Sequence, residues 1–166
     1  MNIECVIGLG ANLNNPQQQI LAACLQLQED SNILNFELSS LYSSTPMGPQ
    51  NQPDYVNAVA LFNTYLAPHT LLDLMQAIEL KHGRVRAERW GPRTLDLDLL
   101  FYGNQSINDD RLTVPHPGIL QREFVIVPLA ELRPHYPLPN NQTALHYAEA
   151  LDLRELKAIH PGLPII

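Results

Sequence analysis

The amino-acid sequence predicts an α+β fold in which strands and helices follow the β-α-β-β-α-β order of a ferredoxin-like unit. Two segments repeat apolar residues at helical spacing, four others are apolar runs or alternate apolar with polar residues, and Pro or Gly residues separate them. The chain has 166 residues, which is enough for one domain with a substantial core. We therefore expect a single domain over residues 1–166, with a β-hairpin and C-terminal helices added to this unit.

The first half of the unit is predicted to be strand, helix and strand. Residues 5–10 form a short apolar run that ends in Gly-Leu-Gly, which is typical of a buried strand followed by a turn. Asn15 and Pro16 are an N-cap and a first-turn proline, and apolar residues continue at helical spacing to about Glu29. Residues 34–38 alternate between apolar and polar side chains, which predicts a second strand.

The second half begins with a strand and a helix. Residues 55–65 follow a long loop that contains several prolines, and they are predicted to form the third strand. Pro68 begins a helix whose apolar residues face the core until Gly83 ends it. Gln76 and Glu79 share one face of this helix because they are three residues apart.

The clearest strand signal comes next, in residues 95–102. Apolar residues at 95, 97, 99 and 101 alternate with residues 96, 98, 100 and 102, and the dipeptide Gly103-Asn104 is expected to turn a hairpin. Residues 117–132 and 144–159 are predicted to be mostly helical, with short breaks such as Pro128.

The most specific chemical feature of the sequence is Asp96-Leu97-Asp98 in this last strand. Side chains at positions i and i+2 of a strand project from one face, about 6.5 Å apart along it, so both carboxylates reach one small volume. Carboxylate oxygens suit Mg²⁺, which keeps several waters and completes its shell with substrate phosphates. The alternative is a pair of solvated aspartates on an exposed sheet face.

Basic residues are concentrated just before this strand. Residues 81–93 hold five of the ten Lys and Arg and one acidic residue, a charge of +4, whereas the rest, with five basic and sixteen acidic residues, carries −11. Arg side chains bind phosphate oxygens bidentately, and Trp90 among them indicates an ordered loop. A basic helix end that complements the helix dipole would account only for Lys81 or Arg84. Acidic strand and basic loop together predict metal-assisted phosphoryl transfer.

Composition argues against several other classes of protein. A formal charge of −7 disfavours nucleic acid and anionic membranes as partners, and no apolar run approaches the roughly 18 residues of a membrane span. Residues 8–10 lack the third glycine of a dinucleotide fingerprint, and no P-loop motif occurs. Two cysteines make no disulfide framework, and the first residues do not resemble a signal peptide, so we expect a cytoplasmic protein.

Two other functions remain compatible with these features. A metal-dependent nucleotide-sugar transferase also uses Asp-x-Asp, although it would need a larger fold than this chain offers. A non-catalytic RNA-binding module could use a ferredoxin-like sheet, but the RNP consensus is absent and only 7% of the residues are aromatic. Among the six histidines, which show no zinc-like spacing, His116 is singled out because Arg111, Thr113 and Arg122 lie close to it in sequence.

Residues 89–100, Arg-Trp-Gly-Pro-Arg-Thr-Leu-Asp-Leu-Asp-Leu-Leu, closely resemble the signature of the 6-hydroxymethyl-7,8-dihydropterin pyrophosphokinase family. The likeness extends to residues 8–13, 48–57 and 111–117 and so covers nearly the whole chain. It implies a ferredoxin-like α+β sandwich and an ATP-dependent diphosphokinase of folate biosynthesis. Such an enzyme transfers pyrophosphate from ATP to the pterin hydroxymethyl group and releases AMP. We expect it to act as a monomer on these two small molecules.

The resemblance also implies roles for individual residues. Asp96 and Asp98 would hold two Mg²⁺ ions, and Arg84 and Arg93 would bind phosphates. The nucleotide-side residues would be Gln76, Glu79, Trp90, Arg111, Thr113, His116 and Arg122. The pterin-side residues would be Ser44, Thr45, Met47, Tyr55, Asn57 and Phe124, with two aromatic rings stacking on the pterin and the amide hydrogen-bonding to it. No residue is singled out as the general base: either aspartate could accept the hydroxyl proton, or positioning could supply most of the acceleration.

Overall fold

The structure is a computed structural model that describes residues 2–13, 15–44, 54–83, 95–151 and 157–160. In chain order the elements are β1 (Ile3–Ala11), α1 (Pro16–Glu29), β2 (Ile33–Leu38), β3 (Leu41–Ser44), β4 (Tyr55–Thr64), α2 (Pro68–Lys81), β5 (Asp96–Tyr102), β6 (Ile107–Asn108), β7 (Thr113–Val114), a 3-10 turn (Ile119–Gln121), α3 (Glu123–Leu132), α4 (Ala144–Ala150) and β8 (Lys157–His160). In this part of the chain no helix has the length and apolar character needed to cross a membrane.

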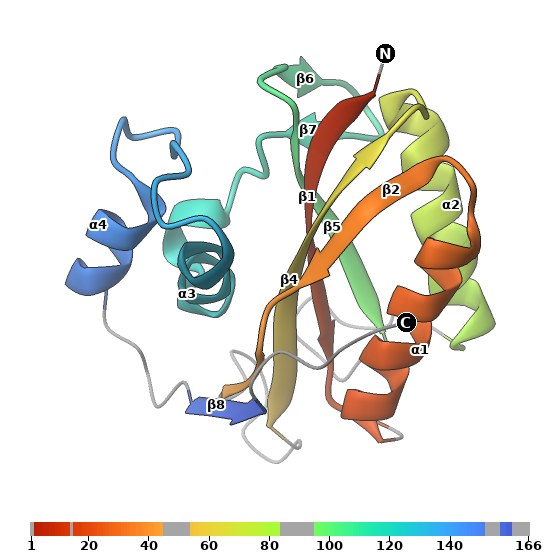
Figure 1. Ribbon diagram of the computed structural model, residues 1–166, viewed down its shortest axis with the longest axis horizontal. Coiled ribbons are helices and arrows are strands. Elements are labelled where there is room, and N and C mark those ends of the chain that lie inside the picture. Colours follow the sequence, from red (N-terminus) through yellow and green to blue (C-terminus); the bar gives the residue numbers. More distant parts are fainter. Residues whose placement is uncertain (1, 14, 45–53, 84–94, 152–156, 161–166) are drawn as a thin grey trace.

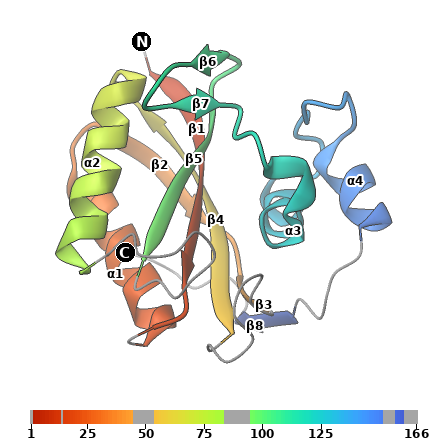
Figure 2. The ribbon, with the colours of Figure 1, turned by 180° about the vertical axis from the view of Figure 1, so that it is seen from behind.

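The described residues form a central antiparallel sheet between two layers of helices. Helices α1 and α2 cover one face, whereas α3 and α4 lie on the opposite side (Figures 1 and 2). β1 lies between β4 and β5, β2 and β3 both pair with β4, and β8 pairs with β3. The predicted α+β fold is confirmed, and the elements follow the predicted order except for one additional strand, β3, between β2 and β4. β1 is buried from Cys5 to Ala11 because other elements cover both of its faces.

The first apolar core fills the space between the sheet and helices α1 and α2. Each helix turns one stripe of buried side chains toward alternate residues of β1 and β4. The stripes consist of Ile20, Cys24 and Leu27 on α1 and of Leu71, Met75 and Ile78 on α2. Complete burial of one such aliphatic side chain contributes about 1.5–3 kcal/mol to the free energy of unfolding, so these stripes anchor both helices.

The two cysteines belong to this first core. Cys5 and Cys24 are buried free thiols, and burial raises the pKa of each to about 12. Both therefore stay protonated at neutral pH and act as small apolar side chains.

The second apolar core lies between the other face of the sheet and α3. It joins Val6, Val59 and Leu61 of the sheet to Ile126 and Leu129 of the helix. Farther along the same strands this face carries polar residues instead of apolar ones. The polar part of this face is therefore where the fold can place a ligand site.

A β-bulge at Leu100 changes which way the end of β5 faces. Leu99 pairs with Ile7 and Phe101 pairs with Val6, so Leu100 is the extra residue. Before the bulge the alternation is as predicted. After it the parity changes, so Phe101 packs in the second core with Leu100 and Tyr102 packs in the first. The predicted alternation through residue 101 is therefore wrong at its last position.

Three further expectations need correction. The turn at Gly103 is present, but the described hairpin joins β6 to β7, and it lies beside the start of α2. β3 lies inside a segment expected to be a loop. Residues 157–159, expected to be helical, lie in β8 (Lys157–His160), which covers the edge of β3, a pairing that local sequence does not encode. Residues 117–132 are mostly helical, as predicted, and comprise the 3-10 turn Ile119–Gln121 and α3.

Candidate functional site

Asp96 and Asp98 project from the polar part of the sheet face, as the spacing predicts. Both are partly exposed, while Leu95, Leu97 and Leu99 point into the first core. The two carboxylates are therefore presented together on one side of β5, with the strand held from the other side by apolar packing.

The neighbouring strand leaves space beside these carboxylates. Asp96 lies opposite Gly10 of β1, which in turn lies opposite Asn57 of β4, and Asp98 lies opposite Gly8. With neighbouring strands about 4.8 Å apart, the backbones of Asn57 and Asp96 are roughly 10 Å apart. Because the two residues of β1 opposite the aspartates are glycines, the strand between the amide and the carboxylates carries no side chain there.

Gly10 has a specific steric reason to be glycine. A Cβ atom at this position would lie 2.8 Å from Nδ2 of Asn57, closer than real contacts allow. At Gly8 the corresponding atom would be 3.6 Å from the Leu100 side chain, an ordinary contact. Sequence reasoning did not single out Gly10, although a glycine inside a strand is a signal of close approach.

Arg122 connects the carboxylates to an aromatic side chain. Its Nη1 donates to Oδ2 of Asp98 at 3.2 Å, and the two side chains are 19% and 31% exposed. Its Cζ lies 5.8 Å from the centre of the Phe124 ring, within the range of a cation–π contact. Arg122 therefore contacts two other predicted site residues, Asp98 on β5 and Phe124 at the start of α3.

His116 lies close to the same cluster and is held in one tautomer. Its backbone N–H donates to the carbonyl of Leu100, and its Nδ1 accepts a hydrogen bond from the Gly118 N–H at 3.1 Å. Burial, followed by the charge of Arg122, lowers the pKa of His116 to about 4, although Asp96 acts in the opposite direction. At neutral pH the ring is therefore uncharged, and the proton is on Nε2, which can donate.

Other nucleotide-side candidates gather where α2 meets the β6–β7 hairpin. Nη2 of Arg111 donates to Oδ1 of Asp73 at 2.6 Å and to Oε1 of Gln76 at 3.2 Å. A second contact, between Nε2 of His69 and Oδ2 of Asp109 at 2.7 Å, ties the hairpin to the start of the helix. The structure therefore brings Arg111 and Gln76 together, as their proposed common role requires.

Glu79 and the remaining candidates complete the comparison with the prediction. The Glu79 side chain is buried between α2 and β5, and its Oε2 accepts a hydrogen bond from the Leu97 N–H at 2.7 Å. Thr113 lies on β7, and Ser44 pairs with Tyr55 in the β3–β4 ladder. Five predicted site residues lie outside the described residues: Thr45, Met47, Arg84, Trp90 and Arg93.

The donor set is compatible with magnesium. In the described ranges no group of three or more His, Cys, Asp and Glu side chains is arranged to hold a metal ion by itself. The site instead offers two carboxylates on adjacent positions of one face. A metal held by one or two carboxylates, several waters and substrate phosphates is the arrangement that Mg²⁺ favours, so the residues present fit it.

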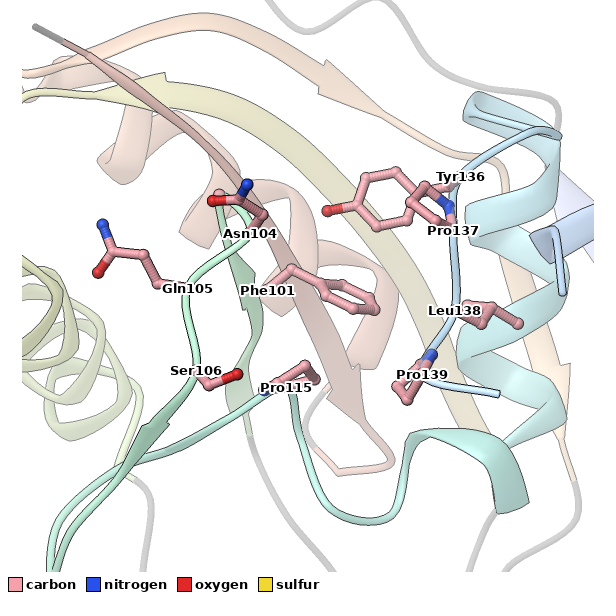
Figure 3. A pocket seen from close by; sticks show the side chains of 10 residues that line it. Phe101, Asn104, Gln105, Ser106, Pro115, Tyr136, Pro137, Leu138 and Pro139 are labelled. Atoms are coloured by element: carbon pink, nitrogen blue, oxygen red, sulfur yellow. The ribbon is translucent and has the colours of Figure 1, made fainter. Parts of the chain in front are cut away.

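A separate cavity of about 180 Å³ lies near the other end of β5 (Figure 3). The figure shows the Phe101 ring between the turn after β5 and the segment that carries Tyr136, with Pro115 nearby. Its lining residues carry no charge and include none of the predicted site residues: Phe101, Gly103, Asn104, Gln105, Ser106, Pro115, Tyr136, Pro137, Leu138 and Pro139. This cavity is therefore distinct from the candidate site.

Comparisons with known proteins agree with the geometry. The family model described as 7,8-dihydro-6-hydroxymethylpterin-pyrophosphokinase matches residues 6–134. The chain is 54% identical over 140 residues to 2-amino-4-hydroxy-6-hydroxymethyldihydropteridine pyrophosphokinase of Haemophilus influenzae, covering 84% of this chain and 88% of that protein. Its counterpart of the same name from Pseudomonas aeruginosa is 48% identical over 136 residues, covering 82% and 84% of the two chains.

A likeness to solved structures concerns the fold alone. A crystal structure of the HPPK-DHPS of Plasmodium falciparum, a triple mutant, superposes with a TM-score of 0.71 at 13% sequence identity. The match covers 90% of this chain and 43% of that longer one. The fold is therefore one that has been observed experimentally, in a chain with little sequence identity to this one.

Proposed function

Because the chain belongs to the 7,8-dihydro-6-hydroxymethylpterin-pyrophosphokinase family, we propose that its polar sheet face binds ATP beside 6-hydroxymethyl-7,8-dihydropterin. The enzyme transfers pyrophosphate from ATP to the pterin hydroxymethyl group, giving AMP and the pterin diphosphate used in folate synthesis. The observation that carries the assignment to this face is the pair of carboxylates Asp96 and Asp98, which share it with Asn57.

The pterin is proposed to bind on the Asn57 side of the site. The Asn57 amide is largely buried and can both donate to and accept from a flat heterocycle. Tyr55 is two residues before it on β4 and therefore points from the same face, and Phe124 lies at the start of α3. Rings from these two elements can stack on a planar ligand. Ser44, Thr45 and Met47 are proposed to read its edge.

The triphosphate is proposed to bind on the carboxylate side. Asp96 and Asp98 would hold two Mg²⁺ ions, which lower the charge of the triphosphate and polarise it for attack. Arg122, already in contact with Asp98, is close enough to bind phosphate oxygens, and Arg84, Arg93 and Trp90 are assigned to the same side.

The nucleoside end is proposed to lie toward α2 and the β6–β7 hairpin. Arg111, Gln76 and Thr113 line this side, and the contact between Arg111 and Gln76 supports a shared role. His116 would act as a neutral donor through Nε2, because its Nδ1 already accepts the Gly118 N–H. A neutral donor stabilises phosphate oxygens without a protonation step of its own.

The reaction itself is proposed to be an in-line displacement at the β-phosphorus of ATP. The pterin hydroxyl oxygen forms the new bond to phosphorus, the bond from phosphorus to the α–β bridging oxygen breaks, and AMP leaves. The hydroxyl proton passes to solvent or to one of the two aspartates. Positioning of the two substrates next to each other supplies a large part of the acceleration.

The function is tested by the nucleotide product. With ATP, Mg²⁺ and 6-hydroxymethyl-7,8-dihydropterin, the protein should form AMP and the pterin diphosphate in equal amounts, as measured by chromatography. Omitting the pterin should abolish AMP formation. Formation of ADP, or nucleotide turnover that ignores the pterin, would rule out pyrophosphoryl transfer and favour another phosphoryl-transfer reaction.

Replacing Gly10 with alanine should weaken pterin binding specifically. The new Cβ would lie 2.8 Å from Nδ2 of Asn57, so the amide must move away from its position. Loss of one neutral hydrogen bond and some stacking geometry corresponds to a rise in the pterin KM of about tenfold, with the ATP KM nearly unchanged. Steady-state kinetics with each substrate varied in turn measures both values.

The matched control for this substitution is Gly8→Ala, on the same strand and face. Its Cβ makes only an ordinary contact of 3.6 Å with Leu100 and leaves Asn57 in place, so the pterin KM should stay within about twofold of the original value. If Gly10→Ala folds normally and binds the pterin as well as the unchanged protein, Asn57 is not the pterin-binding amide.

A further inference from the structure

The strand that carries both aspartates has an outer edge that needs hydrogen-bond partners. Among the described strands, β5 pairs only with β1, which leaves the backbone groups on its other side without a neighbouring strand. Buried backbone N–H groups in native proteins are nearly always paired, because an unpaired one costs free energy. The outer edge of β5 must therefore be satisfied by groups other than a strand.

One partner on this edge is the side chain of Glu79. Glu79 is 3% exposed on the inner face of α2, and its Oε2 accepts the Leu97 N–H at 2.7 Å. A buried carboxylate is costly unless it is hydrogen-bonded, and a bond from a backbone N–H to a carboxylate is stronger than one between neutral groups. The chain therefore uses a buried carboxyl oxygen to bind a peptide unit of β5.

The peptide unit that Glu79 binds joins Asp96 to Leu97 and so lies between the two candidate metal ligands. Leu97 follows Asp96 and precedes Asp98, and its own side chain is 5% exposed in the first core. Packing of this side chain holds the strand on the face opposite the carboxylates, and the hydrogen bond at its N–H holds the strand at its outer edge. A displacement of this peptide unit would change the separation of both carboxylates and the direction in which they point.

We propose that Glu79 is a positioning residue for pyrophosphoryl transfer, which fixes the Leu97 amide and so sets the arrangement of the Asp96 and Asp98 carboxylates. The proposal rests on the proposed function of that pair. It differs from the role that the family resemblance implies for Glu79, a direct contact with the nucleotide. A side chain that is 3% exposed and bound to the backbone of β5 acts through the strand.

The direct test follows the Leu97 amide in protein without metal or nucleotide. Removing the acceptor in Glu79→Ala should accelerate hydrogen exchange of this amide, measured by NMR, by at least about tenfold. Glu79→Gln keeps an oxygen acceptor of the same reach and should preserve most of the protection. Glu79→Asp keeps the carboxyl group but is one methylene shorter, so its oxygen should not reach the Leu97 N–H and the protection should also be lost. This variant provides the test if the alanine variant does not fold.

The functional readouts should follow the same order among the variants. We expect the alanine and aspartate variants to bind Mn²⁺ about tenfold more weakly in the presence of a non-hydrolysable ATP analogue, as followed by electron paramagnetic resonance. Their kcat should fall about 10- to 100-fold with the pterin KM unchanged, and the glutamine variant should recover most of this loss.

Ser39→Ala provides a matched control. The Ser39 hydroxyl oxygen is also buried and accepts a hydrogen bond from a backbone N–H, that of Val59, at 3.0 Å. Val59 is on β4, two strands away from β5. Its loss should lower the melting temperature without changing Leu97 exchange, Mn²⁺ affinity or kcat.

The outcomes separate the positioning role from its alternatives. Wild-type Leu97 exchange and Mn²⁺ affinity in the alanine and aspartate variants would overturn it, as would a rise in the ATP KM alone, which indicates a nucleotide contact. If the unchanged protein forms no AMP, the proposed function fails instead. Because exchange and Mn²⁺ binding do not depend on turnover, they still report whether Glu79 positions the carboxylates.

Discussion

Replacing Asp98 with alanine is expected to lower kcat for AMP formation by at least about a thousandfold, while pterin affinity stays within about threefold. The carboxylate contributes one of two hard-oxygen donors on this face, and no other described side chain on β5 can replace it. Because the proposed pterin contact, Asn57, lies two strands away, pterin binding should be nearly unaffected. Steady-state AMP assays give kcat, and quenching of pterin fluorescence gives the affinity.

Asp98→Asn and Asp96→Ala sharpen this test. The asparagine variant keeps the shape but loses the charge, so it should be almost as impaired as the alanine variant if the carboxylate binds a cation. Glu149→Ala on α4 removes an exposed carboxylate far from β5 and should leave kcat unchanged. Near-normal turnover in both Asp96→Ala and Asp98→Ala would show that the two side chains are solvated surface groups.

The features of the site that depend on local periodicity could be predicted from sequence. A strand places every second side chain on one face whatever its neighbours are, so the common orientation of Asp96 and Asp98 follows from two positions alone. The start of α1 at Pro16 and its end near Glu29 likewise follow from the first-turn proline and the apolar spacing, and both are confirmed, although Asn15 makes no side-chain cap hydrogen bond. These signals need no knowledge of which segments pack together.

The features that depend on pairing between distant segments could not be predicted. The bulge at Leu100 inserts one apolar residue next to another, Phe101, so the hydrophobic pattern carries no trace of it. The need for glycine at position 10 follows from the side chain of Asn57, which reaches it only through the β1–β4 register. Similarly, β8 forms because β3 offers an edge, and not because residues 157–160 favour a strand.

The same limitation affects the interpretation of charged residues. The sequence shows Glu79 and Gln76 on one helical face, and family resemblance assigns both to the nucleotide. In the structure Gln76 contacts Arg111, whereas Glu79 turns inward to the backbone of β5. Whether a carboxylate on a helix faces a ligand or a strand depends on the tertiary packing of that helix, which a single sequence does not specify.

Arg122→Ala is expected to change catalysis and cation binding in opposite directions. Arg122 forms an ion pair with Asp98 at 3.2 Å, and the two side chains are largely shielded from solvent. Without it, Mn²⁺ should bind the carboxylate pair several-fold more tightly in the absence of nucleotide, because one competing positive charge has been removed. In contrast, kcat should fall about 100-fold, since the guanidinium would no longer stabilise charge on the transferring phosphates. Electron paramagnetic resonance titrations and AMP assays measure the two effects separately.

Arg122→Lys and Arg133→Ala separate charge from shape and from general surface effects. Lysine keeps the positive charge but loses the planar group above Phe124, so cation competition should persist while kcat recovers only in part. Arg133 forms a comparable but exposed ion pair with Glu37 at the opposite end of α3, and its loss should affect neither measurement. Opposite changes in kcat and Mn²⁺ affinity in Arg122→Ala are expected if the guanidinium binds Asp98 before the substrate arrives and binds the phosphates afterwards. If both quantities fall together in Arg122→Ala, the arginine instead supports the metal site, and its assignment to the phosphates is wrong.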